Sequence, residues 1–193
     1  MHFNTHQPVR ITAYPHSPYF FILTPNLNHH AMPLTAQYWI DHLYLQPHPE
    51  GGYYKEVFRS TNGVIRVGEQ IEKQACTSIY YLLEGKDFSG FHRLASDELW
   101  YFHKGAPLHI HVIDNDGAHS VIELSDSATG QLQAVIPPNT WFASEIPSGS
   151  GFALVSCAVA PGFDFAEFEM AKQDKLIAQW PQHKDLLERL CRE

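Results

Sequence analysis

His92 and Glu98 are the residues best suited to proton chemistry, because they stand on either side of a short turn at residues 95–97. Side chains two apart on a strand share a face, so Glu98, Trp100 and Phe102 should line one side of the strand after the turn. An imidazole, with a pKa of about 6.5, suits proton abstraction near neutral pH. A carboxylate beside it would hold one tautomer and stabilise the imidazolium. The spacing therefore predicts a histidine–carboxylate pair under an aromatic wall, suited to removing a proton next to a carbonyl.

Other side chains are candidates for the same site, and each also has a plainer interpretation. Tyr101 or Tyr81 would return the proton as an acid, although tyrosines in aromatic-rich cores mostly pack. Glu50 stands in a turn between Pro and Gly, as either a pocket residue or a solvated turn residue. Arg59 would bind a carboxylate or phosphate through bidentate hydrogen bonds, unless it is an ordinary strand-end charge. The structural alternative for His92 is a histidine hydrogen-bonded within the core.

Short segments rich in Val, Ile, Phe, Tyr and Trp must position these side chains, with Gly, Asp, Asn and Pro turns between them. Such strands and turns are what a closed antiparallel sandwich or barrel needs, so we predict an all-β core. The expected strands are Tyr53–Arg59, Ser78–Leu83, Phe88–Leu94, Glu98–His103, Leu108–Ile113, Ser120–Leu124, Gln133–Ile136, Trp141–Ser144 and Phe152–Val159.

A short helix precedes this core. Apolar residues recur at three- and four-residue spacing over Thr35–Leu45, and the prolines that follow stop the helix. Residues 1–33 show no periodicity, so we predict a loosely ordered extension before a single domain of residues 34–193. Met32 directly precedes the helix, and an upstream start would explain the extension. The alternative is a swapped arm that packs on a partner subunit through residues 19–21.

Helical segments are also expected after the last strand. Phe165, Phe168 and Met170 lie among charged residues past Pro161, and the final helix is expected over Lys184–Leu190. Such helices would cover the barrel or a subunit interface.

Composition narrows the classes of function. A chain of 193 residues with 44% hydrophobic residues can bury one sizeable core. Thirteen Lys and Arg face 21 Asp and Glu, and the net charge of -8 disfavours nucleic acid as a partner. No apolar run approaches the roughly 20 residues that span a bilayer, so we expect no membrane partner. Three widely separated cysteines without zinc-site spacing favour a reducing cytoplasm.

The segment around His92 resembles the first motif of the cupins, in which H-x-H precedes a Glu and, after a six-residue spacing, a Gly. His92, Glu98 and Gly105 match this motif. Residues 137–142 resemble the second cupin motif, with Asn139 where Gly is usual, and Asn tolerates a left-handed turn. The resemblance implies a double-stranded β-helix, the jelly-roll barrel of the cupins.

Two positions depart from the metal-binding form of these motifs, since Leu94 and Phe142 stand where a metallocupin has histidines. Only His92 and Glu98 remain, whereas catalytic metal sites usually keep three protein ligands. A second H-x-H at residues 109–111 could supply ligands, but alternating polar residues usually mark the outer face of a strand. We therefore predict no cofactor, with a divalent metal at His92 and Glu98 as the minor alternative.

A narrower resemblance covers nearly the whole chain from residue 34 onward. The strings that carry it are His48-Pro49-Glu50-Gly51-Gly52-Tyr53-Tyr54, Arg59-Ser60, Ser96-Asp97-Glu98-Leu99-Trp100-Tyr101-Phe102-His103 and Val159-Ala160-Pro161-Gly162-Phe163-Asp164-Phe165. They are similar to one uncharacterised cupin family without a settled reaction. The resemblance implies a homodimer and a pocket similar to that of dTDP-sugar epimerases.

Together these patterns favour a metal-independent isomerase or epimerase that acts on a sugar-like or nucleotide-sugar-like ligand, with His92 as base. A non-catalytic binding or sensing module and a metal-dependent cupin oxygenase or isomerase are the alternatives. The residues expected to contact the small-molecule ligand are Glu50, Arg59, Tyr81, Trp100, Phe102 and Phe142.

Overall fold

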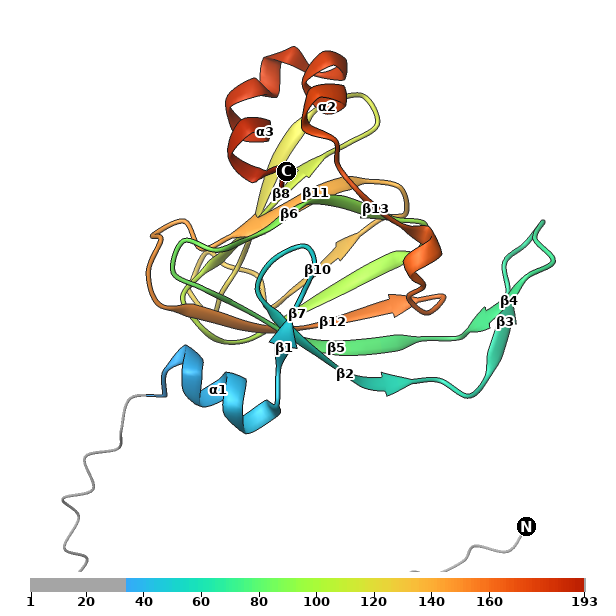
Figure 1. The fold of residues 1–193 in the computed structure, drawn as a ribbon, viewed down its shortest axis with the longest axis horizontal. Coiled ribbons are helices and arrows are strands. Elements are labelled where there is room, and N and C mark those ends of the chain that lie inside the picture. The colour runs from blue at the N-terminus through green and yellow to red at the C-terminus, as the bar shows by residue number, and fades with distance from the viewer. Residues whose placement is uncertain (1–33, 193) are drawn as a thin grey trace, which may run out of the picture. The chain divides into compact units, whose positions relative to one another are not determined.

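The computed structural model describes residues 34–192, in which two antiparallel sheets pack face to face (Figure 1). The predicted extension at residues 1–33 lies outside the described residues. The six-stranded sheet has the order β1 (Gln46–Pro47), β2 (Tyr53–Arg59), β5 (Thr77–Glu84), β12 (Phe152–Ala160), β7 (Asp97–Gly105) and β10 (Gln133–Ile136). The five-stranded sheet has the order β13 (Phe168–Met170), β6 (Phe88–Leu94), β11 (Trp141–Glu145), β8 (Leu108–Ile113) and β9 (His119–Leu124). The prediction of an all-β jelly roll is confirmed.

Alternating side chains explain how the two sheets bury one core. On β7, Glu98, Trp100 and Phe102 are buried, whereas Asp97 and His103 on the opposite face are exposed. Trp100 packs edge-on against Phe142 of β11, with ring centroids 6.1 Å apart, so the two sheets meet at these rings. Because the period is two, one face of each strand enters this core and the other faces solvent or a helix.

Helices cover the sheets from two sides. Helix α1 (Ala36–Leu43) is capped by the Thr35 hydroxyl, which accepts a hydrogen bond from the backbone N–H of Tyr38. Helices α2 (Gln173–Gln179) and α3 (Lys184–Leu190), joined by the 3₁₀ turn η2 (Pro181–His183), lie over the five-stranded sheet (Figure 1). The residues packed there include Phe91, Ile113, Ala143, Leu176 and Leu187. Within the described residues, no helix has the length and apolar character needed to cross a membrane.

Four short strands were not predicted. Strand β1 has two residues, and the hairpin of β3 (Gly63–Ile65) and β4 (Glu72–Gln74) extends away from both sheets (Figure 1). Strand β13 and the short 3₁₀ helix η1 (Phe165–Glu167) occupy the segment that was predicted to be helical, so that prediction is wrong for Phe168–Met170, which form a strand. Strand β13 pairs with β6, with Phe168 opposite Leu94 and Met170 opposite His92.

Asn139 adopts the left-handed conformation expected of it, with φ of 60°. Its backbone N–H donates to the carbonyl oxygen of Leu94 at 2.6 Å. The turn therefore keeps its shape without glycine, since Asn tolerates this region better than most residues.

Candidate functional site

A cavity of about 470 Å³ lies at one end of the six-stranded sheet, within the size range of small-molecule pockets. Its wall combines strand residues with the turn before β2 and the segment that contains η1. The lining residues are Gln46, His48, Glu50, Tyr54, Glu56, Arg59, Gln74, Thr77, Ser78, Ile79, His92, Leu94, Glu98, Cys157, Val159, Phe163, Asp164, Phe165 and Phe168. His92, Glu98, Glu50 and Arg59, all predicted from the sequence, therefore share one cavity.

His92 is held in one orientation by its own strand. The side chain is 2% exposed, and Nδ1 lies 2.8 Å from the carbonyl oxygen of Gly90. A carbonyl oxygen only accepts hydrogen bonds, so Nδ1 carries the proton of the neutral ring and Nε2 is left as the basic nitrogen. The ring of Phe142 packs against the imidazole with centroids 4.1 Å apart.

The carboxylate next to His92 belongs to Glu50. Oε2 of Glu50 lies 3.3 Å from His92 Nε2 and 3.7 Å from His48 Nδ1, and the Glu50 side chain is 8% exposed. An imidazolium formed at His92 would therefore face a buried carboxylate. His48 Nδ1 also accepts a hydrogen bond from the Glu50 backbone N–H at 3.3 Å, while burial lowers the pKa of His48.

Glu98 makes no ion pair within 4.0 Å among the described residues, so Glu50 rather than Glu98 is the partner of His92. The Glu98 side chain is buried, and its Oε2 has no hydrogen-bond partner among the described residues. Burial and, to a smaller extent, the nearby charge of Glu50 together raise the pKa of Glu98 to about 8. Glu98 is therefore mostly a neutral carboxylic acid at pH 7.

The aromatic residues predicted to contact the ligand lie beneath the cavity instead of lining it. Trp100, Phe102 and Phe142 belong to the core between the sheets. Tyr81 is also buried, and its hydroxyl donates to the carbonyl oxygen of Gly51 at 2.7 Å, which supports the turn that carries Glu50. These residues shape the floor of the site and the turn beside it.

Tyr101 does not line the cavity. It alternates with the buried residues Trp100 and Phe102 on β7, so its side chain lies on the other face of that strand. A ligand in the cavity would not meet its hydroxyl.

Arg59 lines the cavity, but its guanidinium is already engaged. Its Nε and NH2 groups donate to the two carboxylate oxygens of Glu56 at 2.9 and 2.6 Å. Its NH1 group donates to Gln74 Oε1 at 3.2 Å and to the carbonyl oxygen of Phe163 at 3.3 Å. Four of the five N–H donors of an arginine are thereby used.

Several cavity residues were not predicted. Phe163, Phe165 and Phe168 form an aromatic cluster with ring centroids 4.9 to 6.2 Å apart. His48 packs edge-on against Tyr54, with ring centroids 4.5 Å apart, and also edge-on against Phe168 of this cluster at 6.4 Å. The strings that carry the family resemblance already contain His48, Tyr54, Phe163 and Phe165, so treating each string as a candidate cavity wall would have found them.

Cys157 also lines the cavity, and its side chain is a protonated thiol instead of a reactive thiolate. Burial raises its pKa well above the usual value, and the charges of Glu98 and Glu50 raise it further. None of the three cysteines, Cys76, Cys157 and Cys191, forms a disulfide.

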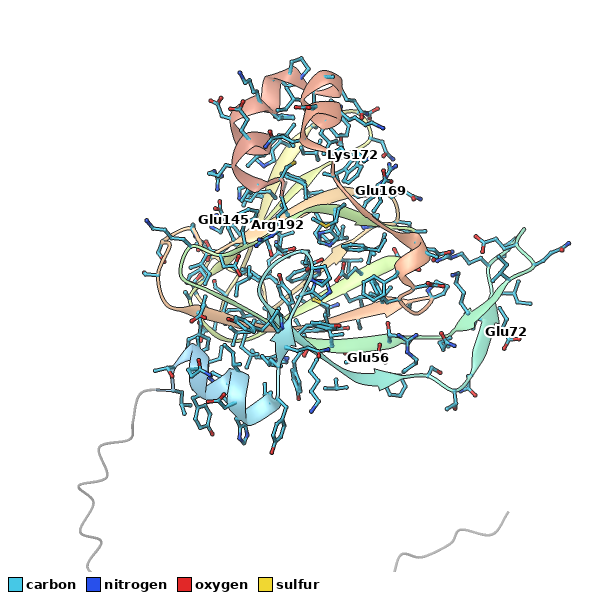
Figure 2. All side chains as sticks on the ribbon, in the orientation of Figure 1. Glu56, Glu72, Glu145, Glu169, Lys172 and Arg192 are labelled. Atoms are coloured by element: carbon cyan, nitrogen blue, oxygen red, sulfur yellow. The ribbon has the colours of Figure 1, made fainter. Side chains whose placement is uncertain are left out.

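Arg192, labelled in Figure 2, follows α3 directly in the chain. Its guanidinium holds the turn that carries Glu50. Its Nε donates to the carbonyl oxygen of Glu50 at 2.5 Å, and its NH2 group donates to Asp87 Oδ1 at 2.5 Å and to the carbonyl oxygen of Phe88 at 2.6 Å. Asp87 Oδ2 in turn accepts from the backbone N–H of Gly52 at 2.8 Å. A Cβ on Gly51 would lie 2.0 Å from Arg192 NH2, so only glycine allows this approach.

The cavity does not fit a metal of the kind that metallocupins hold. Leu94 and Phe142 occupy two of the four ligand positions, and Leu94 presents an apolar side chain to the cavity. In residues 34–192, no group of three or more His, Cys, Asp or Glu side chains has the geometry to hold a metal ion.

The second H-x-H, at residues 109–111, lies outside the cavity lining. His111 is buried against Glu145, with Nε2 3.0 Å from its Oε1, and Nδ1 lies 3.1 Å from His119 Nε2. His109 lies 3.8 Å from Glu123. These histidines therefore belong to a charged network on the five-stranded sheet.

Comparison with known proteins extends these findings. The model of one protein family, described as Cupin superfamily (DUF985), matches residues 37–171. An uncharacterized protein of Saccharomyces cerevisiae is 30% identical over 159 residues, which cover 75% of this chain and 79% of the yeast protein. The structure of a hypothetical protein from Leishmania major has 37% identity and a TM-score of 0.76, covering 82% of this chain and 99% of that chain. The structure of a protein from Shewanella oneidensis has 38% identity and a TM-score of 0.75, covering 82% and 98% respectively.

Proposed function

We propose that this chain, which belongs to the family described as Cupin superfamily (DUF985), is a metal-independent isomerase or epimerase of small polar molecules. The observation that carries the proposal is the presence of a base and a neutral acid in one cavity. His92 Nε2 is the basic nitrogen, and Glu98 stays protonated because its pKa is raised to about 8. A basic ring nitrogen and a protonated carboxyl group in one cavity are a usual arrangement for acid–base catalysis.

The reaction needs only proton transfers. Neutral His92 takes a proton from a carbon next to a carbonyl group of the ligand, and the electrons of the C–H bond form an enol or enolate. Glu98 donates a hydrogen bond, or its proton, to the carbonyl oxygen, while Glu50 stabilises the imidazolium. Return of the proton to the opposite face of that carbon, while Glu98 takes back its proton from the enol oxygen, gives the epimer. In a ligand with a hydroxyl on that carbon, return of the proton to the former carbonyl carbon, while Glu98 takes the proton of that hydroxyl, gives the isomer; either route restores both groups.

Exchange of ligand protons into heavy water tests this mechanism. The purified protein is incubated with a panel of aldoses, ketoses, sugar phosphates and nucleotide sugars, and loss of C–H signals is followed by NMR. We expect exchange with the wild type, and its loss in His92→Asn. His109→Asn, the same change outside the cavity, is the matched control. Exchange that His92→Asn leaves unchanged would overturn the role of His92.

A non-catalytic binding module is the second candidate, and the aromatic cluster favours it. Phe163, Phe165 and Phe168 offer ring faces on which a ligand can stack without any reaction. On this alternative, a compound binds without proton exchange, and Phe168→Ala weakens binding more than His92→Asn does.

A further inference from the structure

The cavity has no free cationic side chain among the described residues. Arg59 is the one Lys or Arg in the described cavity lining, and Glu56 holds it through two hydrogen bonds. Lys73, near the mouth, lies 3.4 Å from Asp164 Oδ2 and 3.0 Å from Glu167 Oε1. A phosphate or carboxylate would have to break one of these ion pairs before it found a positive partner.

Carboxyl groups, by contrast, are plentiful in the lining. Glu50, Glu56, Glu98 and Asp164 all contribute to the wall. An anionic ligand would therefore meet like charges at Glu50, and it would make ionisation of Glu98 harder still.

Several polar groups in the cavity wall can both donate and accept hydrogen bonds. A protonated carboxyl group both donates and accepts, and Glu98 Oε2 has no partner among the described residues. The amides of Gln46 and Gln74 and the hydroxyls of Thr77 and Ser78 also both donate and accept. A ligand hydroxyl complements all of these groups, because it too both donates and accepts. A phosphate dianion only accepts.

We propose that the cavity takes an uncharged, hydroxyl-bearing ligand, such as an unphosphorylated monosaccharide, and discriminates against the phosphorylated and carboxylated forms of the same sugar. Glu98 is the hydrogen-bonding anchor for a ligand hydroxyl or carbonyl, and the aromatic cluster covers an apolar face of the ring. The inference rests on the proposed function only in using the same cavity.

Calorimetry on matched ligands tests this assignment. Each monosaccharide of the panel is compared with its 1-phosphate, its nucleoside diphosphate derivative and its uronic acid, which are all anionic. We expect at least one free sugar to bind. Its anionic forms should bind with an affinity that is lower by about tenfold or more. Tighter binding of any charged form, or no binding by any uncharged sugar to folded protein, would overturn the proposal.

Three variants sharpen the test. Glu98→Leu removes the anchor and should weaken sugar binding about tenfold, whereas Glu98→Gln, whose amide also donates and accepts, should restore most of it. Glu56→Gln frees the Arg59 guanidinium and should strengthen binding of the sugar phosphate. Equal loss in both Glu98 variants, or no gain for the phosphate in Glu56→Gln, would count against the charge argument.

The outcome is separable from that of the proposed function. Sugar binding without proton exchange would uphold the ligand class and reject the isomerase. Proton exchange with phosphorylated sugars alone would uphold the isomerase and reject the uncharged ligand class.

Discussion

Glu98 carries its carboxyl group into a buried part of the cavity, and this sets the charge that it holds at neutral pH. Burial and, to a smaller extent, the nearby charge of Glu50 together raise its pKa to about 8. We expect infrared spectroscopy to show a protonated carboxyl band at neutral pH that disappears with a midpoint of about pH 8. Glu98→Gln should lack the band, and Glu56→Gln, which changes a solvent-accessible carboxylate, should keep it. A wild-type protein without the band at neutral pH would contradict this assignment.

The raised pKa of Glu98 also makes a prediction for stability. Between pH 4.5 and about 8, the folded protein keeps a proton on Glu98 that the unfolded chain has released. The stabilising contribution of that proton is complete below pH 4.5 and is lost as the pH rises through about 8. The free energy of unfolding of Glu98→Gln should therefore fall less with pH across this window. Urea unfolding at several pH values measures the two slopes, and parallel slopes would argue against a buried neutral acid.

At the scale of elements, the position of Glu50 depends on groups far from it in sequence. Arg192 after α3 bonds to the Glu50 carbonyl oxygen and to Asp87, and Asp87 holds the backbone N–H of Gly52. We expect Arg192→Met to destabilise the protein by about 1–2 kcal/mol, since these hydrogen bonds are only partly buried. The same variant should also slow the exchange of ligand protons that His92 catalyses, because Glu50 would no longer be held at 3.3 Å from the imidazole. This slowing should exceed what the smaller fraction of folded protein explains.

Arg189→Met is the matched control for Arg192→Met. Arg189 of α3 also pairs with a carboxylate, that of Glu145 on β11, but its side chain is half exposed. We expect a change below about 0.5 kcal/mol in the free energy of unfolding and no change in exchange. Equal effects of the two variants on exchange would show that Arg192 stabilises the fold without positioning Glu50.

The elements show what a sequence pattern can and cannot predict. Strand β7 was predictable because its alternation buries one face, whereas the hairpin of β3 and β4 has mostly exposed side chains and no such pattern. Alternation also gave the correct face for Glu98, Trp100 and Phe102. It does not tell how far along the strand the cavity reaches, so Trp100 and Phe102 were assigned to the ligand although they belong to the core. The approach of Glu50 to His92 depends on the long-range contacts of Arg192, which no local pattern contains.

At the scale of the whole molecule, histidines with lowered pKa values should make the protein sensitive to mild acid. Full or partial loss of solvent contact lowers the pKa of His48, His103, His111 and His119 below the usual value of 6.5, and at His111 the neighbouring His119 and Arg189 lower it further against Glu145. The unfolded chain therefore takes up more protons than the folded protein once the pH falls below 6.5. The contribution of these neutral histidines to the free energy of unfolding is present above pH 6.5 and is lost as the pH falls toward their lowered pKa values.

Glu98 opposes this trend over the same range, so the measurement belongs in the Glu98→Gln background. There we expect the free energy of unfolding to fall steadily from neutral pH to about pH 5, and the fall to be smaller when His111→Gln is added. His109→Gln, at a more exposed position of the same strand, is the control. An identical pH dependence with and without His111→Gln would exclude this histidine as a source of the acid sensitivity.

The exposed edge of the six-stranded sheet leads to a prediction about assembly. Among the described residues, β1 pairs only with Tyr53 and Tyr54, which leaves the outer edge of β2 open over residues 55–59. A bulge in β2 accompanies two successive exposed apolar side chains, Val57 and Phe58, and Ile65, Val67 and Ile71 of the nearby hairpin are exposed as well. Open edges and exposed apolar side chains mark interaction surfaces, and a second copy related by a two-fold axis would cover both at once.

We therefore expect a homodimer that forms along β2, and we expect Val57→Lys with Phe58→Lys to convert it to a monomer. Val135→Lys on β10, at the opposite edge of the same sheet, should leave the dimer intact. Sedimentation equilibrium over a range of concentrations distinguishes these states, and a monomeric wild type or a monomeric Val135→Lys variant would exclude an interface at β2. Because β2 also supplies Tyr54, Glu56 and Arg59 to the cavity wall, the partner would border the cavity mouth. The monomeric variant should then bind the ligand more weakly although every cavity residue is unchanged.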